Sequence, residues 1–165
     1  GVGTFAVQLA KAFGAEVTAV SSAENLELMR SLGADQVIDY RREDFTKGKQ
    51  RYDLIVDVGG RPSVAACRRA LTYDGTLVLV GAGKGDWFGP LTRFAVGAVR
   101  SRLLKQRVVG FLAEVTKENL LLLKGIIEAG KVTPVIDRTY PLSEAAEALR
   151  YVEPGHAKGK VVITV

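Results

Sequence analysis

The sequence predicts an α/β fold built on a doubly wound parallel sheet. Short runs rich in valine and isoleucine alternate along the chain with longer segments whose apolar residues recur at helical spacing. A glycine turn, Gly1-Val2-Gly3, directly precedes the first of these helical segments. The 165 residues are 47% hydrophobic and 25% charged, which fits one globular domain with a sizeable core. Strands that alternate with amphipathic helices are typical of a parallel sheet covered on both faces.

The first half of the chain begins with an expected helix at residues 4–13, which ends before Gly14 because glycine commonly stops a helix. The second expected helix ends at Gly33 for the same reason. The elements after the first helix are a strand at 16–20, a helix at 23–32, strands at 36–40 and 52–58, a helix at 62–71 and a strand at 76–80.

The second half continues the alternation. The expected elements are a helix at 91–106, a strand at 108–112, a helix at 116–129, an extended segment at 132–140, a helix at 143–152 and a strand at 160–165.

Composition excludes several classes of site. The net charge of +5 comes from Lys and Arg spread along the whole chain, so nucleic-acid binding is not expected. The single cysteine, Cys67, and the single histidine, His156, provide neither a disulfide nor a metal site, so we interpret Cys67 as a packing residue. No apolar run reaches about twenty residues and no basic leader precedes the start, so we expect neither a membrane span nor a signal peptide. A cytoplasmic location is the expectation.

The glycine turn is a candidate pyrophosphate site. Glycine lets the backbone approach a phosphate, and the free amides and dipole at a helix N-terminus attract its charge. The alternative is a tight turn with no ligand. A strand that ends about twenty residues later, where Rossmann-type folds bind the adenosine ribose, favours dinucleotide binding.

The end of that strand bears on which dinucleotide binds. A site for NAD(H) usually offers a carboxylate to the ribose 2′-hydroxyl, whereas a site for the 2′-phosphate supplies donors or cations. Ser21 and Ser22 with nearby Asn25 therefore favour NADP(H) over NAD(H), and Tyr40 could contact the phosphate or adenine. Glu24 opposes this interpretation, because its charge would repel the phosphate. The alternative role of Ser22 is to cap the following helix.

An ordered series of motifs resembles the cofactor-binding half of the medium-chain dehydrogenase/reductase superfamily, and within it the zinc-independent quinone oxidoreductase and enoyl reductase branch. The matching segments are GVGTFAVQLAK at 1–11, LGADQVIDY at 32–40, DVGG at 57–60, VGA at 80–82, GKVTPVIDR at 130–138 and GHAKGKVV at 155–162.

The resemblance implies a place along the cofactor for each matching residue. Gly1 and Val2 would contact the pyrophosphate, and Ser21, Ser22, Asn25 and Tyr40 the adenosine-phosphate end. Val58, Gly59, Gly81 and Ala82 would border the ribose and nicotinamide half, and Phe111, Leu112 and Ala113 would meet the carboxamide. Lys158 and Lys160 lie in a turn that approaches the cofactor in relatives; a solvated basic turn is the alternative.

The resemblance also implies an organisation. Residues 1–130 would form a Rossmann-type NADP(H)-binding domain lacking its first, central strand, and residues 131–165 a C-terminal segment that joins a catalytic domain outside this chain. We therefore expect the polypeptide alone to be unstable or inactive. The exposed edge of the strand at 108–112 is expected to pair with its copy in a homodimer. The basic amphipathic segment at 87–107 would cover the substrate cleft or contact a partner subunit, with membrane-surface binding as the alternative.

The implied activity is an NADPH-dependent transfer of hydride to a quinone, enone or similar activated alkene. No residue has a clear claim to be the proton donor, so the catalytic residues are unknown, and no metal is expected from these residues. The alternatives are the cofactor domain of a zinc-dependent alcohol dehydrogenase and a non-catalytic NADP(H)-binding redox sensor.

Overall fold

A computed structural model describes residues 1–59, 62–80, 105–110, 115–155 and 157–165. Most of the helix expected at 91–106 lies outside these residues. The chain divides into two compact units, one of residues 1–39 with 115–165 and the other of residues 40–114. These units are not the domains expected from the resemblance, and the boundary at residue 130 stays a prediction.

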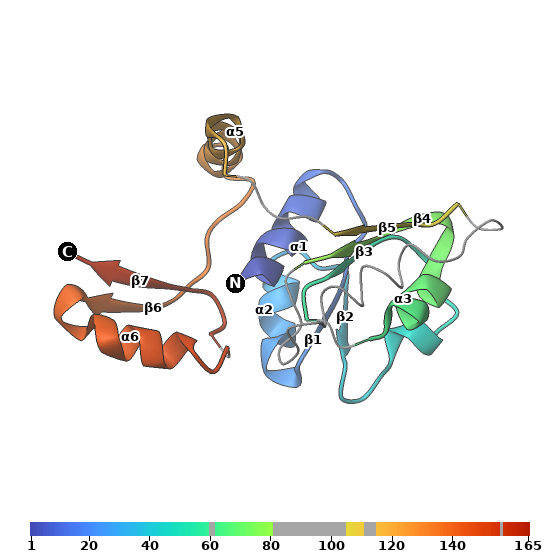
Figure 1. Ribbon diagram of the computed structural model, residues 1–165, viewed down its shortest axis with the longest axis horizontal. Coiled ribbons are helices and arrows are strands. Elements are labelled where there is room, and N and C mark those ends of the chain that lie inside the picture. Colours follow the sequence, from blue (N-terminus) through green and yellow to red (C-terminus); the bar gives the residue numbers. More distant parts are fainter. Residues whose placement is uncertain (60–61, 81–104, 111–114, 156) are drawn as a thin grey trace. The chain divides into compact units, whose positions relative to one another are not determined.

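The first unit begins with α1 (Val2–Ala12), β1 (Thr18–Ser21), the short 3-10 helix η1 (Ala23–Asn25), α2 (Leu26–Ser31) and β2 (Gln36–Asp39) (Figure 1). β1 and β2 pair in parallel, with Thr18 opposite Gln36. Gly14 and Gly33 have φ angles of +79° and +99°, which explains why the helices before them stop there.

A small core holds these elements together. Val7 of α1, Ala19 of β1 and Met29 of α2 are buried in one cluster with Ala34. Val7, Ala19 and Met29 come from three different elements, so their contacts hold the two helices against the strand pair.

The rest of the first unit contains α5 (Lys117–Glu128), β6 (Ile136–Pro141), the 3-10 helix η3 (Leu142–Glu144), α6 (Ala145–Val152) and β7 (Lys160–Thr164). β6 and β7 are parallel, and α6 lies beside them (Figure 1). No residue of α5 is buried in the part of the chain that the structure describes.

The second unit contains the 3-10 helix η2 (Phe45–Lys47), β3 (Tyr52–Asp57), α3 (Val64–Ala70), β4 (Leu71–Leu79) and β5 (Arg107–Gly110). The strands form a parallel sheet in the order β3-β4-β5. Its core joins α3 to β3 and β4 through Ile55, Val64, Cys67, Ala70, Leu71, Leu77 and Leu79. Cys67 is buried there, which confirms its interpretation as a packing residue.

The parallel strands and intervening helices confirm the α/β class. The described strands form three separate sheets, β1-β2, β3-β4-β5 and β6-β7, rather than one continuous sheet. β4 begins five residues before its expected start, because α3 passes directly into it at Leu71.

Candidate cofactor-binding site

The glycine turn becomes the start of α1, because Val2 and Gly3 are already helical, two residues before the expected start of the helix. Gly1 is the N-cap residue, and the hydroxyl of Thr4 donates to the Gly1 carbonyl at 2.8 Å. A Cβ added at Gly1 or Gly3 would meet no atom within 4 Å, so open space adjoins both residues. The first turn of α1 contains no acidic residue. A helix N-terminus with no acidic residue in its own first turn can attract an anion.

The end of β1 carries a small hydrogen-bonded cluster. The buried hydroxyl of Ser22 donates to Glu24 Oε2 at 3.0 Å and accepts from Asn25 Nδ2 at 3.2 Å. Ser22 occupies the N-cap position of η1 but its side chain makes no capping bond, so the interpretation of Ser22 as a side-chain cap is wrong. The Ser22 hydroxyl oxygen accepts from the side-chain amide of Asn25 instead of from a backbone amide of η1.

The side-chain oxygen of Asn25 is an acceptor to which no described residue donates a hydrogen bond. Its Oδ1 is buried and has no hydrogen-bond partner among the residues that the structure describes. A buried polar atom without a partner is costly, so it calls for an explanation such as a bound ligand group. A ribose hydroxyl could donate to it, which agrees with the expected adenosine end of the site.

The basic turn before β7 lies beside α1. The ammonium of Lys160 is 5.6 Å from the centre of the Phe5 ring, which is within reach of a cation–π interaction. The structure therefore places Lys160 of the Lys-Gly-Lys turn beside Phe5 of α1, which follows the glycine turn by two residues in the sequence.

The other expected cofactor residues belong to the second unit or lie outside the described residues. Tyr40, Val58 and Gly59 belong to the second unit, where the guanidinium of Arg41 lies 5.8 Å from the Tyr40 ring. Gly81, Ala82, Phe111, Leu112 and Ala113 lie outside the described residues. Their roles stay predictions.

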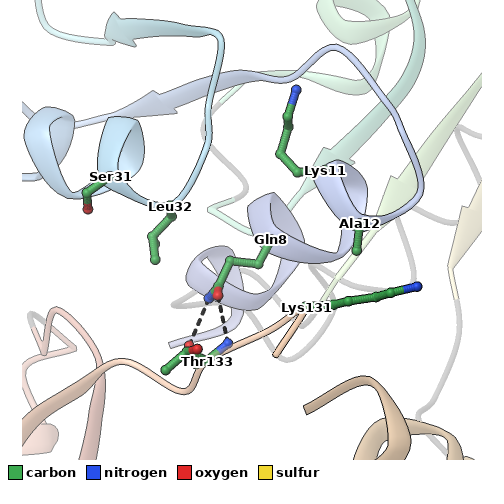
Figure 2. Close-up of a pocket in the computed structure, with 7 residues that line it drawn as sticks. All are labelled: Gln8, Lys11, Ala12, Ser31, Leu32, Lys131 and Thr133. Carbon is green, nitrogen blue, oxygen red and sulfur yellow. Dashed lines mark hydrogen bonds between the residues drawn. The ribbon is translucent and has the colours of Figure 1, made fainter. Parts of the chain in front are cut away.

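A pocket in the first unit lies elsewhere on α1 (Figure 2). It lies along the C-terminal half of that helix, about 12 Å from the glycine turn at 1.5 Å per residue. Its lining residues are Gln8, Lys11, Ala12, Ser31, Leu32, Lys131 and Thr133, none of which belongs to the expected site.

Sequence reasoning missed several residues that join distant segments of the first unit. Gln8 bonds the backbone of Thr133, and Asp137 bonds both Tyr151 and the amide of Lys158. These partners are separated by 14 to 125 positions, so no local motif signals them.

Among the described residues, no helix is long and apolar enough to cross a membrane. Among the same residues, no three His, Cys, Asp or Glu side chains are grouped closely enough to hold a metal ion.

Comparison with known proteins identifies relatives of the chain. Residues 32–163 match the family described as zinc-binding dehydrogenase. A mitochondrial NAD(P)H oxidoreductase of Mus musculus is 40% identical over the whole chain and 46% of its own length. A chloroplast envelope quinone oxidoreductase homolog of Arabidopsis thaliana is 32% identical over 99% of this chain and 49% of its own.

A solved structure gives the same result. The quinone oxidoreductase from Coxiella burnetii superposes with a TM-score of 0.81 and 31% identity, covering the whole chain and 50% of that protein. The chain thus spans about half the length of the relatives it matches. These findings confirm the resemblance to the medium-chain dehydrogenase/reductase superfamily and its quinone oxidoreductase branch, and the chain belongs to the zinc-binding dehydrogenase family.

Proposed function

We propose that this chain is the cofactor-binding part of an NADPH-dependent oxidoreductase that transfers hydride to a quinone or an activated alkene. The observation that carries the proposal is that Lys160 of the basic turn lies beside Phe5 in α1, a helix whose first turn contains no acidic residue. Relatives support the reaction class, because they include a quinone oxidoreductase homolog and an NADPH-dependent alkenal/one oxidoreductase, both of Arabidopsis thaliana.

The bound cofactor would supply the hydride from its nicotinamide ring, so the residues here bind and orient it. The backbone of Gly1 and Val2 would face the pyrophosphate at the positive end of α1. Asn25 Oδ1, which has no partner among the described residues, would accept from a hydroxyl of the adenosine ribose.

The preference for NADP(H) depends on the cluster at the end of β1. Ser21, Ser22 and Asn25 provide polar groups for a 2′-phosphate, whereas the Glu24 carboxylate holds the Ser22 hydroxyl and adds a negative charge. We expect NADPH to be preferred over NADH, with Glu24 reducing the margin.

Steady-state turnover of the full-length protein with a quinone, an enone and an alcohol tests the proposal. The Glu24→Gln variant should raise the ratio of kcat/KM for NADPH to that for NADH about fivefold, since one charge repulsion at 4 Å in water is worth about 1 kcal/mol. Glu27→Gln is the matched control, because Glu27 is exposed on α2 and paired with Arg30. A preference for NADH that Glu24→Gln leaves unchanged would contradict the assignment of NADP(H).

The same assay separates the alternatives. Oxidation of alcohols without reduction of quinones would favour an alcohol dehydrogenase, a class that a solved relative of 28% identity and TM-score 0.76 represents. Cofactor binding without turnover of any substrate would favour a redox sensor.

We further propose a homodimer that forms through β5. This strand is last in the order β3-β4-β5, so among the described residues only β4 pairs with it. A free strand edge can pair with a second copy. Light scattering of the full-length protein tests this, and a monomer at assay concentration would overturn it.

The expected cytoplasmic location stays a prediction, because the relatives' names place them in mitochondria and chloroplasts.

A further inference from the structure

A carboxylate outside the expected site ties three segments of the first unit together. Asp137, on β6, accepts two hydrogen bonds at the same oxygen, one from the hydroxyl of Tyr151 at 2.9 Å and one from the amide of Lys158 at 2.8 Å. The guanidinium of Arg138 lies 4.0 Å from the centre of the Tyr151 ring and supports this arrangement. Asp137 thereby connects β6, α6 and the turn before β7.

The turn that Asp137 contacts has little freedom to move. The Lys160 amide donates to the Val135 carbonyl at 2.7 Å, so the amides on both sides of Gly159 are bonded to protein. A Cβ at Gly159 would lie 2.4 Å from the Val135 oxygen, closer than real Cβ atoms approach. The backbone of residues 158–160 is therefore held in one position against β6.

That position determines where the Lys160 charge lies. The ammonium of Lys160 lies 5.6 Å from the centre of the Phe5 ring, in the first turns of α1. A cation beside the positive end of a helix is unfavourable by itself, whereas an anion placed there would interact with both. The two positive groups are thus arranged for a shared negative ligand.

Asp137 is equipped for this task at neutral pH. Burial raises the pKa of its carboxyl, but the hydrogen bonds from the Lys158 amide and the Tyr151 hydroxyl outweigh burial, and the pKa lies below its ordinary value. The bond to Asp137 in turn raises the pKa of Tyr151. The carboxylate therefore remains an acceptor and the tyrosine a donor.

We infer that Asp137 is a positioning residue for the cofactor pyrophosphate, which acts by holding the Lys158-Gly159-Lys160 turn so that Lys160 faces the N-terminus of α1. The inference rests on the proposed function, because it assumes that a dinucleotide binds there. Asp137 itself does not touch the cofactor; it acts through the turn.

The test uses the full-length protein and measures the Kd for NADPH and for ADP by calorimetry, with kcat and KM in parallel. Asp137→Asn should raise both Kd values and the KM for NADPH about tenfold with little change in kcat, as expected when a hydrogen bond to a charged group worth about 1.5 kcal/mol is lost. Lys160→Met should have a similar effect. Tyr151→Phe, which removes one of the two bonds, should have a smaller one.

A double-mutant cycle separates positioning from a general loss of stability. If Asp137 acts through Lys160, then Asp137→Asn in the Lys160→Met background should cause little further loss, whereas independent effects would add. The matched control is Asp35→Asn, because Asp35 also accepts from a lysine and a backbone amide in the same unit. It should leave the Kd for NADPH unchanged.

The outcomes are distinct. Additive losses, an equal loss in Asp35→Asn, or unchanged affinity in Asp137→Asn and Lys160→Met would overturn the inference while leaving the proposed function standing. If Asp137→Asn does not fold, the cycle is run with Tyr151→Phe instead and read in the same way. A wild-type protein that neither binds nor turns over a nicotinamide dinucleotide would overturn both.

Discussion

Replacing Gln8 with methionine should release the segment around Thr133 from α1. The Gln8 amide is 9% exposed and spans two parts of the first unit (Figure 2). Its Oε1 accepts from the Thr133 amide at 2.8 Å, and its Nε2 donates to the Thr133 carbonyl at 3.0 Å and to the Thr4 carbonyl at 3.0 Å. Methionine has a similar length and shape but makes none of these bonds.

The size of the effect follows from the two bonds to Thr133. Each typical hydrogen bond contributes about 0.5–1.5 kcal/mol net, so the pair holds the segment by about 1–3 kcal/mol. That range corresponds to about a 5- to 150-fold change in the population of the open segment. The bond from Gln8 to Thr4 lies within α1 and does not enter this sum.

Amide hydrogen exchange of the full-length protein measures the effect directly. Exchange at Thr133 should accelerate about 5- to 150-fold in Gln8→Met, while amides of the β4 core keep their wild-type rates. The control is Gln36→Met, because the side-chain amide of Gln36 is exposed and its hydrogen bond, from Nε2 to Glu16 Oε1, is long at 3.4 Å. Unchanged exchange at Thr133, or the same acceleration in Gln36→Met, would refute the reasoning.

Two further predictions concern stability and are measured by urea denaturation of the full-length protein. Leu77 has no exposed surface, so Leu77→Ala should cost about 3–5 kcal/mol of unfolding free energy, whereas Leu54→Ala, at a position 55% exposed, should cost less than about 1 kcal/mol. Similar losses at both positions would contradict the assigned core. The hydrogen bond from Lys11 lowers the pKa of Asp35, and the Val17 amide lowers it further, so its stabilisation is present above the unfolded-state pKa and disappears as the pH falls through the lower folded-state value. The stability difference between wild type and Asp35→Asn should therefore be full near pH 7, begin to fall near the ordinary carboxyl pKa of about 4 and vanish only below the lower folded-state pKa, and a difference that grows in acid would reverse the assigned sign.

Local patterns predicted most of the described elements. Alternating β-branched runs and helical spacing placed β1, β2, β3 and α5 within about two residues of their bounds, the usual uncertainty of helix and strand ends. The glycine stops were predictable because a positive φ at Gly14 or Gly33 is a property of the residue itself. Membership of the zinc-binding dehydrogenase family followed from the order of the motifs.

The cluster at the end of β1 was only half predictable. Ser22 and Asn25 were identified as polar groups of the site, but whether the Ser22 hydroxyl oxygen accepts from a backbone amide or from the Asn25 side chain depends on side-chain directions. Both kinds of donor lie within three positions of Ser22, so sequence distance could not distinguish them. In the structure the donor is the side chain of Asn25.

The sequence by itself therefore determined the α/β class, the order of the elements and the glycine turn, because each depends on residues that are neighbours along the chain. Tertiary structure alone decided that Gln8 bonds the backbone of Thr133 and that Lys160 lies beside Phe5. It also decided that Asp137 accepts from the amide of Lys158 in the turn before β7. Such contacts depend on how packed elements approach one another, and residues more than 100 positions apart carry no local pattern that specifies it.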